Sequence, residues 1–305
     1  MKIGLIDVDG HNFPNLPLMK LSAYHKNKGD SVEWYEPLFS GHMDIVYMSK
    51  VFSFTPDFQY FVDADMVMKG GTGYFYPSGG EKLPDEIEHI YPDYSIYFDK
   101  IPEVRNTAYG FLTRGCPRGC DFCIVGEKEG KCSVKVADLS EFWGGQKNIV
   151  LLDPNLFACK EWEDLSQQLI DSGAWVDFSQ GCDIRIMTDK KAEYIKRMKI
   201  KQIHFAWDRY EDKEIIIPKF RHFKEITGWE YQKLGVYVLC NFNTSFEQDL
   251  ERIYTLRDLG YNPFVMLYNK ETIPKGHRLK HLQRWVNNRI VFRTCERFED
   301  FDARK

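Results

Sequence analysis

Three cysteines stand close together in the chain with the spacing C-x3-C-x2-C: Cys116, Cys120 and Cys123. Cysteine thiolates are the usual ligands of iron–sulfur clusters, and a cubane cluster in an ordinary electron carrier takes four of them. Three thiolates from one loop would hold three irons and leave the fourth iron open to a ligand that is not protein. The spacing therefore predicts a [4Fe-4S] cluster with one open coordination position.

A zinc site, or a set of unrelated structural cysteines, is the competing interpretation. Zinc sites usually combine a C-x2-C pair with a second such pair or with a pair of histidines. Cys132 is the next cysteine, but it follows too closely for a zinc ribbon and has no partner two or three residues on. We expect the cysteines outside the loop to be small buried hydrophobic residues: Cys132, Cys159, Cys182, Cys240 and Cys295.

The segments around the loop predict the elements that position it. An apolar strand at 109–112 comes just before the cysteines, and apolar runs that end in polar residues follow at 148–153, 175–180, 202–208, 234–241 and 264–269. Helices are predicted between them at 161–172, 189–198 and 213–227, and from a capping box at 244–247 to Gly260. Six such strand–helix units indicate a partial, open (β/α)6 barrel of the TIM type, with functional residues at the carboxyl ends of the strands.

This cysteine spacing, at the first strand–helix turn of a βα series, resembles that of the radical S-adenosylmethionine (SAM) superfamily. The resemblance implies that the open iron of the cluster chelates the amino and carboxylate groups of SAM. An electron from the cluster would then cleave SAM to methionine and a 5'-deoxyadenosyl radical, which abstracts hydrogen from a small bound substrate. It also implies an electron donor such as a flavodoxin or a ferredoxin.

The resemblance also suggests which residues contact SAM. In the family, residues after strand two hold the amine, strands three and four serve the carboxylate and ribose, and strand five packs its backbone on adenine. The chain departs from the family in two places. The usual Gly-Gly-Glu is absent near Asp153, and segment 235–241 matches the family's strand-five pattern only loosely. The alternative is that the polar strand ends are helix caps and turns. The expected SAM contacts are Phe122, Asp153, Asn155, Gln180, Asp183, Arg185, Tyr237, Val238, Asn241 and Tyr268.

The first 105 residues predict a separate small domain. Short apolar strands at 2–6, 31–35, 44–49 and 66–69 surround a helix that is capped by Asn15 and ends at Gly29. This alternation indicates a Rossmann-like parallel sheet. An irregular connector, with one helical turn at 84–88, leads into the barrel. We therefore expect domains at 1–105 and 106–305.

The small domain resembles the cobalamin-binding domain that precedes many radical SAM cores, and Gly70-Gly71 matches its glycine pair. That family places its cobalt-ligating histidine in a D-x-H-x-x-G loop, where this chain has Asp9, so we expect no cobalamin. Ligands of open parallel sheets bind beyond the carboxyl ends of the strands. Ordinary turn chemistry is the alternative for these residues. The expected substrate contacts are Asp7, Asp9, His11, Phe13, Asn15, Ser53, Tyr74 and, from the barrel, Asp208.

The composition of the chain limits the class of protein and the cellular compartment that we expect. The net charge is −4 with dispersed basic residues, which argues against a nucleic-acid partner. No apolar run is long enough to span a membrane, and no leader opens the sequence. An oxygen-sensitive cluster needs a reducing compartment, and eight cysteines in a chain of this length do not make a disulfide scaffold, so we expect the cytoplasm. Segment 275–292 predicts an amphipathic helix that closes the barrel, or alternatively contacts an anionic partner. Its apolar face is Leu279, Leu282, Val286 and Ile290.

The chain length and the altered cobalamin-like domain resemble the layout of queuine lyases. That resemblance implies cleavage of queuine to the aminomethyl-deazaguanine precursor of queuosine (preQ1), a salvage reaction on a deazapurine base. A cobalamin-dependent methyltransferase, or a radical enzyme acting on a natural product or peptide, is one alternative. An iron–sulfur module that regulates or binds nucleic acid without catalysis is another. The sequence identifies no catalytic residue.

Overall fold

The computed structural model of the protein describes residues 1–10 and 12–302. The chain forms two compact units, Met1–Ala174 and Trp175–Lys305. The domain boundary predicted at residue 105 lies inside the first unit and stays a prediction.

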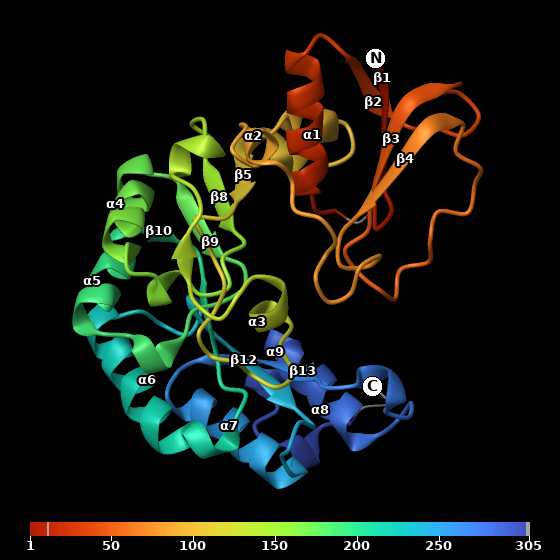
Figure 1. The fold of residues 1–305 in the computed structure, drawn as a ribbon. Helices are drawn as coiled ribbons and strands as arrows, with labels where there is room; N and C mark the ends of the chain where they lie inside the picture. Colours follow the sequence, from red (N-terminus) through yellow and green to blue (C-terminus); the bar gives the residue numbers. More distant parts are fainter. Residues whose placement is uncertain (11, 303–305) are drawn as a thin grey trace. The chain divides into compact units, whose positions relative to one another are not determined.

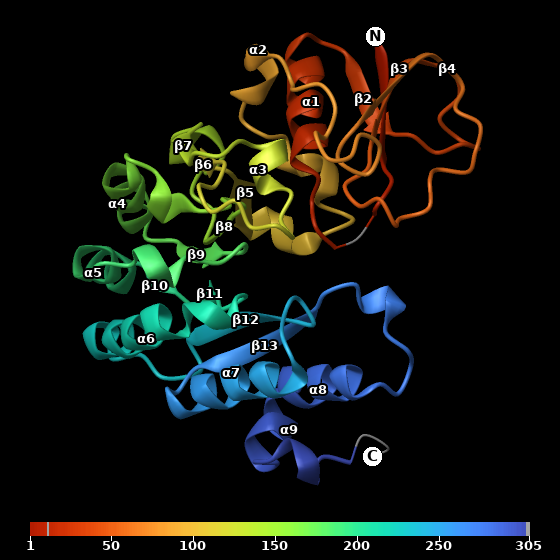
Figure 2. The ribbon, with the colours of Figure 1, turned by 60° about the horizontal axis from the view of Figure 1, so that its bottom comes forward.

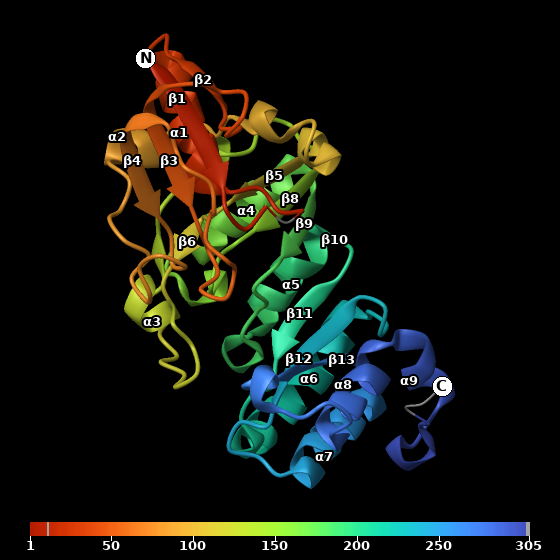
Figure 3. The same ribbon diagram turned by 90° about the vertical axis from the view of Figure 1, so that its right-hand side faces the viewer.

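The first unit opens with a four-stranded sheet in the order β2-β1-β3-β4, and every pair of neighbours is parallel. Figure 3 shows these strands side by side, and Figure 1 shows helix α1 along one face of the sheet. The Rossmann-like arrangement predicted for this region is therefore confirmed. Its elements are β1 (Lys2–Asp7), α1 (Leu16–Asn27), β2 (Ser31–Trp34), β3 (Met43–Ser49) and β4 (Ala64–Gly70).

Local sequence signals explain where α1 begins and what it covers. Asn15 caps the helix, because its side chain accepts a hydrogen bond from the backbone N–H of Leu18 at 3.3 Å. Gly29 follows the helix end with a φ of +82°, a left-handed conformation that glycine adopts without strain. Leu18 packs on Ile3 and Leu5 of β1, so the apolar stripe of the helix and one face of the sheet form one core.

The rest of the first unit carries the cysteine loop and the first two barrel strands. Strands β5 and β8 pair in parallel, and β6 pairs with β7 antiparallel. The first barrel strand was predicted at 109–112 but lies two residues earlier. The elements are α2 (Asp85–Glu88), β5 (Thr107–Gly110), β6 (Thr113–Arg114), α3 (Val125–Lys128), β7 (Val134–Lys135), β8 (Asn148–Leu151) and α4 (Trp162–Ser172).

The second unit continues the strand–helix alternation. Strands β11, β12 and β13 form a parallel sheet, and β9 pairs in parallel with β10. Helices α6, α7 and α8 lie on one side of β11–β13 (Figure 2). The elements are β9 (Trp175–Phe178), α5 (Asp189–Arg197), β10 (Lys199–Ile200), β11 (Ile203–Ala206), α6 (Lys213–Thr227), β12 (Leu234–Cys240), α7 (Phe246–Asp258), β13 (Asn262–Leu267), α8 (Arg278–Asn287) and α9 (Arg289–Thr294).

Two sequence predictions for the second unit were wrong in detail. The capping box that opens α7 is formed by Ser245 and Gln248, one residue later than predicted. The C-terminal helix breaks at Asn288, whose side chain accepts a hydrogen bond from the N–H of Val291 and starts α9. This break turns Ile290 away from the apolar face, and it is 77% exposed, whereas the rest of the predicted face is buried.

A buried ion pair ties the strand ends of the second unit together. Arg252 on α7 is fully buried and pairs with Asp249 at 2.5 Å. Its guanidinium also donates to the backbone carbonyls of Trp207 at 2.6 Å and Leu239 at 2.9 Å. Because these carbonyls lie at the carboxyl ends of β11 and β12, Arg252 links the ends of the two strands.

Among residues 1–10 and 12–302, no helix is both long enough and apolar enough to cross a bilayer.

Candidate active site

The cysteine loop connects β6 to β7, and the antiparallel pairing of these two strands closes the loop at its base. Inside it, the backbone N–H of Cys116 donates to the carbonyl of Gly130 at 3.1 Å. The N–H of Cys123 donates to the carbonyl of Cys120 at 3.0 Å, a tight turn that places these two cysteines on the same short bend. The loop therefore carries all three predicted ligands on a backbone that is tied at both ends.

The donor set of the loop fits an iron–sulfur cluster. All eight cysteines lie in the described residues and none forms a disulfide. The side chain of Asn155 donates to the Cys116 sulfur at 3.5 Å, and its carbonyl oxygen is buried without a partner in the described chain. Hydrogen bonds to cysteine sulfur are one way in which proteins tune such clusters. Within 1–10 and 12–302, no three His, Cys, Asp or Glu side chains are already gathered around a metal position.

The cysteines outside the loop only partly follow the prediction. Cys159, Cys182 and Cys240 are buried, as expected for small hydrophobic side chains. Cys132 is exposed and Cys295 is half-buried, so the prediction was wrong for these two. Both lie in short irregular connections, where the neighbouring side chains do not enclose them.

Gly115 is expected to be essential for the shape of the loop. Its φ is +84°, and a Cβ atom there would lie 2.1 Å from the carbonyl oxygen of Cys132. Gly115→Ala should therefore cost about 2 kcal/mol or more and lower the iron content of the reconstituted protein several-fold. Gly119→Ala is the matched control, because Gly119 has a φ of +58° but a Cβ atom added there would meet no other atom within 4 Å. Equal iron content in the two variants would contradict this role.

Asp153, at the end of β8, anchors the strand that enters the loop. Its carboxylate accepts hydrogen bonds from the N–H of Leu112 at 3.0 Å and from the N–H and hydroxyl of Thr113 at 2.7 and 2.8 Å. Burial raises the pKa of Asp153 to about 7, against the opposing effect of these donors. The observed contacts are all internal, and a contact with the SAM amine stays a prediction.

The raised pKa of Asp153 predicts a pH-dependent stability. Between about pH 4 and pH 7 the folded protein retains a proton on this carboxyl group that the unfolded chain has lost. The free energy of unfolding should therefore fall as the pH rises through this window, by up to about 4 kcal/mol from this group. Urea unfolding of the wild type and of Asp153→Asn at several pH values measures it. A constant difference between the two proteins over that range would refute the prediction.

Two carboxylates hold Arg185, the predicted partner of the SAM carboxylate. Its Nε donates to Asp183 at 2.8 Å and one terminal nitrogen donates to Asp212 at 2.6 Å. Burial lowers the pKa of Arg185, but the two ion pairs outweigh it and the net shift is upward. Gln180, which precedes Asp183 in the chain, is exposed. The guanidinium is thus fixed in position, with one terminal nitrogen left for a ligand.

The other predicted residues of the second unit have different surroundings. Asp208 keeps one buried carboxylate oxygen without a partner in the described chain, and burial raises its pKa. Asn241 has a φ of +67°, and its side chain donates to the carbonyl of Tyr268 at 3.2 Å. Val238 is fully buried in the core, so its side chain is not available to a ligand. Phe122 of the cysteine loop is half-buried.

Two of the predicted substrate residues of the small domain serve the chain itself. Asp9 accepts hydrogen bonds from the backbone of Val51 and Phe52 and from Thr55. Asn15 donates to Ser49 at 2.8 Å in addition to capping α1. These contacts match the alternative interpretation, in which the polar residues stabilise turns.

The remaining predicted substrate residues of the small domain lie on the loops that follow β1, β3 and β4. Phe13 is 47% exposed and stands edge-on to Tyr109 at 5.1 Å, and Ser53 is exposed. The hydroxyl of Tyr74 donates to Asp57. His11 lies outside the described residues. Substrate contact stays a prediction for all of these positions.

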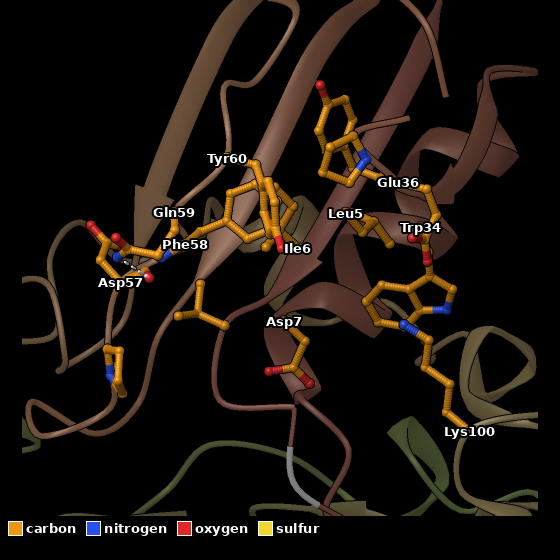
Figure 4. Close-up of a pocket in the computed structure, with 14 residues that line it drawn as sticks. Leu5, Ile6, Asp7, Trp34, Glu36, Asp57, Phe58, Gln59, Tyr60 and Lys100 are labelled. Carbon is orange, nitrogen blue, oxygen red and sulfur yellow. Dashed lines mark hydrogen bonds between the residues drawn. The ribbon is translucent and has the colours of Figure 1, made fainter. Parts of the chain in front are cut away.

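A cavity of about 450 Å³ lies at the carboxyl ends of β1 and β2 (Figure 4). Asp7 lines it and accepts a hydrogen bond from Tyr97 at 2.6 Å. The Lys100 ammonium lies 3.8 Å from the ring centre of Trp34 on another wall. Of the substrate residues predicted in the described part of the small domain, Asp7 is the one that borders this cavity.

The loop after β3 packs closely against the glycines that follow β4 in the small domain, and the expected absence of cobalamin stays a prediction. A Cβ at Gly71 would lie 2.2 Å from the carbonyl oxygen of Lys50, and one at Gly73 would lie 2.5 Å from the Lys50 side chain. The chain's own loop after β3 therefore fills the space beside the glycines. Asp9, at the cobalt-ligand position, is engaged with the same loop.

Sequence reasoning predicted Tyr237 as a SAM contact, which stays a prediction, but missed the side chains around it on the open face of the second unit's strands. His204 on β11 stacks on Tyr237 of β12, with ring centres 4.8 Å apart and planes 9° from parallel. Phe264 of β13 meets Tyr237 edge-on at 5.9 Å. Asp177 of β9 is exposed in an otherwise apolar strand. The signal was available, because charged or polar residues interrupt strands that a doubly covered parallel sheet would fill with apolar residues.

The comparisons with known proteins show the fold. No protein-family model matches the sequence, and no curated protein matches it. A solved structure of the radical SAM methyltransferase TsrM from Kitasatospora setae, with cobalamin and a [4Fe-4S] cluster bound, is similar at a TM-score of 0.57. The likeness covers 87% of this chain and 74% of that one at 11% sequence identity. The chain therefore shares the fold of that structure. The predicted class, a partial barrel preceded by a Rossmann-like domain, is confirmed.

Proposed function

We propose that the protein is a radical SAM enzyme that acts on a small bound substrate. The observation that carries this proposal is the three-cysteine loop after the first barrel strand of a radical SAM fold. Cys116, Cys120 and Cys123 would hold the cluster, which when bound supplies the electron that cleaves SAM. A cytoplasmic flavodoxin or ferredoxin would supply that electron in turn.

The chain's own residues would position the reactants. Asp153 fixes the strand that enters the loop, and Asn155 supports the Cys116 sulfur by a hydrogen bond. Arg185, held by two carboxylates, would offer its remaining nitrogen to the SAM carboxylate, since guanidinium groups bind carboxylates well. Asp208 has an unpartnered oxygen suited to a hydroxyl or ammonium group of a ligand.

Anaerobic reconstitution with iron and sulfide, followed by reduction in the presence of SAM, tests the proposal. We expect a cluster absorbance spectrum and formation of 5'-deoxyadenosine. A protein that binds only zinc, or a loaded and reduced protein that leaves SAM intact, would show that the proposal is wrong. The second outcome would favour the iron–sulfur module that senses or binds without catalysis.

For the specific reaction we propose a queuine lyase, which releases the aminomethyl-deazaguanine precursor of queuosine. Two features support this proposal. One is the layout of the chain, and the other is the small domain, in which the loop after β3 packs closely against Gly71 and Gly73. A cobalamin-dependent methyltransferase is the second candidate, favoured by the fold likeness to TsrM. Turnover of queuine to the smaller base, by a protein purified without cobalamin, supports the lyase. Methylation that requires added cobalamin supports the second candidate.

A further inference from the structure

The two edge strands of the small parallel sheet differ in length and in exposure. β2, at one edge, has four residues, and the charged Glu33 is one of them. β4, at the other edge, has seven residues, and residues 65–69 are exposed without a break (Figure 3). Proteins usually shorten, charge or cover an edge strand, because its free N–H and C=O groups can pair with another strand. β2 is protected in this way, whereas the middle of β4 is uncharged and uncovered.

The backbone of β4 can accept a second strand on its outer side. In residues 1–10 and 12–302, β4 pairs with β3 and with no other strand. The carbonyl of Gly70 accepts a hydrogen bond from the N–H of Lys50 at 3.0 Å, so Gly70 faces β3. Successive strand residues direct their backbone groups to opposite sides. The residues that face the outer edge are therefore Asp65, Val67 and Lys69.

Residues 65–69 are complementary to a second copy of themselves laid antiparallel beside them. When Val67 stands opposite Val67 of the second copy, Asp65 stands opposite Lys69 of that copy and Lys69 opposite its Asp65. On the other face of the sheet Met66, which is 54% exposed, meets Met68 of the second copy. Opposite charges and apolar pairs placed directly across two strands stabilise them, and like charges destabilise them. In this register the residues that face the edge also exchange their N–H and C=O groups with one another.

The two charged residues of this run have only exposed partners in their own chain. Asp65 contacts His42 at 3.2 Å, and Lys69 contacts Asp57 at 3.4 Å. All four side chains are more than two-fifths exposed. The Lys69 ammonium also lies 4.7 Å from the ring centre of Tyr74. Exposed ion pairs contribute little to stability, so both residues can exchange these partners for a pair across two strands.

We propose that β4 is a self-association surface, through which two copies of the chain join by antiparallel β4–β4 pairing about a twofold axis at Val67. The pairing makes one continuous sheet from the small domains of both copies. A twofold contact uses the same surface on each copy and closes, so the expected assembly is a dimer and not a fibre. It also removes the open edge of β4, which would otherwise pair with other chains. Self-association of this kind needs neither the cluster nor SAM.

Reversal of the two charges, one at a time and together, tests the pairing by sedimentation equilibrium of the full-length protein. Asp65→Lys and Lys69→Asp each place like charges opposite one another at two symmetric positions. Each variant alone should therefore self-associate at least about 10-fold more weakly than the wild type. An equimolar mixture of the two variants, and the double variant Asp65→Lys/Lys69→Asp, should recover the association, because opposite charges face each other again. Glu33→Lys makes the same charge change on β2 and is the matched control, which should associate like the wild type.

Three results would overturn the proposal: a wild type that stays monomeric, a mixture that associates no better than either variant alone, or a Glu33→Lys variant as weak as Asp65→Lys. Carbodiimide coupling of the wild type gives a second measurement that needs no variant. Asp65 and Lys69 lie about 13 Å apart along one strand, so a direct bond between their side chains must join two chains. Recovery of that linked peptide supports the pairing, whereas coupling of Lys69 to Asp57 alone contradicts it. Circular dichroism confirms that each variant is folded.

Discussion

Serine in place of Cys116, Cys120 or Cys123 is expected to abolish formation of 5'-deoxyadenosine, by roughly 10³-fold or more. Each replacement would remove one of three thiolates, and the loop offers no other sulfur at the same spacing. The variants should also lose the cluster absorbance after anaerobic reconstitution. The measurements are iron and sulfide content, the visible spectrum, and quantification of 5'-deoxyadenosine after reduction in the presence of SAM.

Cys132→Ser is the matched control for these variants. Cys132 is an exposed cysteine at the base of the same loop, and the three-ligand assignment leaves it out. The control should keep both the cluster and SAM cleavage. If Cys132→Ser loses the metal as completely as Cys116→Ser does, the site has four protein ligands. The open iron position, and the radical chemistry that depends on it, would then be wrong.

Arg252→Met should destabilise the protein by about 3–5 kcal/mol, because it leaves Asp249 as an uncompensated buried charge. Both side chains of this pair are almost completely buried. The loss should also release the carbonyls of Trp207 and Leu239 at the ends of β11 and β12. Urea unfolding followed by circular dichroism measures the change in the free energy of unfolding.

Arg278→Met provides the comparison on the surface. Arg278 pairs with Glu247 at 3.1 Å, but both side chains are more than half exposed. Solvent screens an exposed pair of this kind, so its loss should change the free energy of unfolding much less than the loss of the buried pair does. The double variant Arg252→Met/Asp249→Leu should recover part of the stability lost by Arg252→Met, because no buried charge remains. Similar losses from Arg252→Met and Arg278→Met would contradict the role given to the buried pair.

The order of strands and helices could be predicted because it depends on local signals. Caps such as Asn15 and left-handed glycines such as Gly29 mark helix ends wherever they occur. Where two local signals compete, the prediction slips: Thr244 and Ser245 both suit an N-cap, and the structure uses Ser245. The break at Asn288 was missed for a similar reason, since asparagine is tolerated in a helix but forms a cap when the chain turns there.

In the candidate site, too, the features that depend on local sequence could be predicted, and those that depend on distant contacts could not. The cysteine spacing alone was enough to predict a three-thiolate loop, because the ligands are close in sequence and their chemistry is specific. Only the tertiary structure showed that the Asp153 carboxylate accepts hydrogen bonds from the backbone of Leu112 and Thr113. The same holds for Asp9, whose carboxylate accepts a hydrogen bond from the backbone of Val51. A polar residue at a strand end has the same sequence pattern whether it meets a ligand or a distant backbone N–H. The ring contacts of Tyr237 with His204 and Phe264 likewise depend on strand register, which brings together residues that are far apart in the chain.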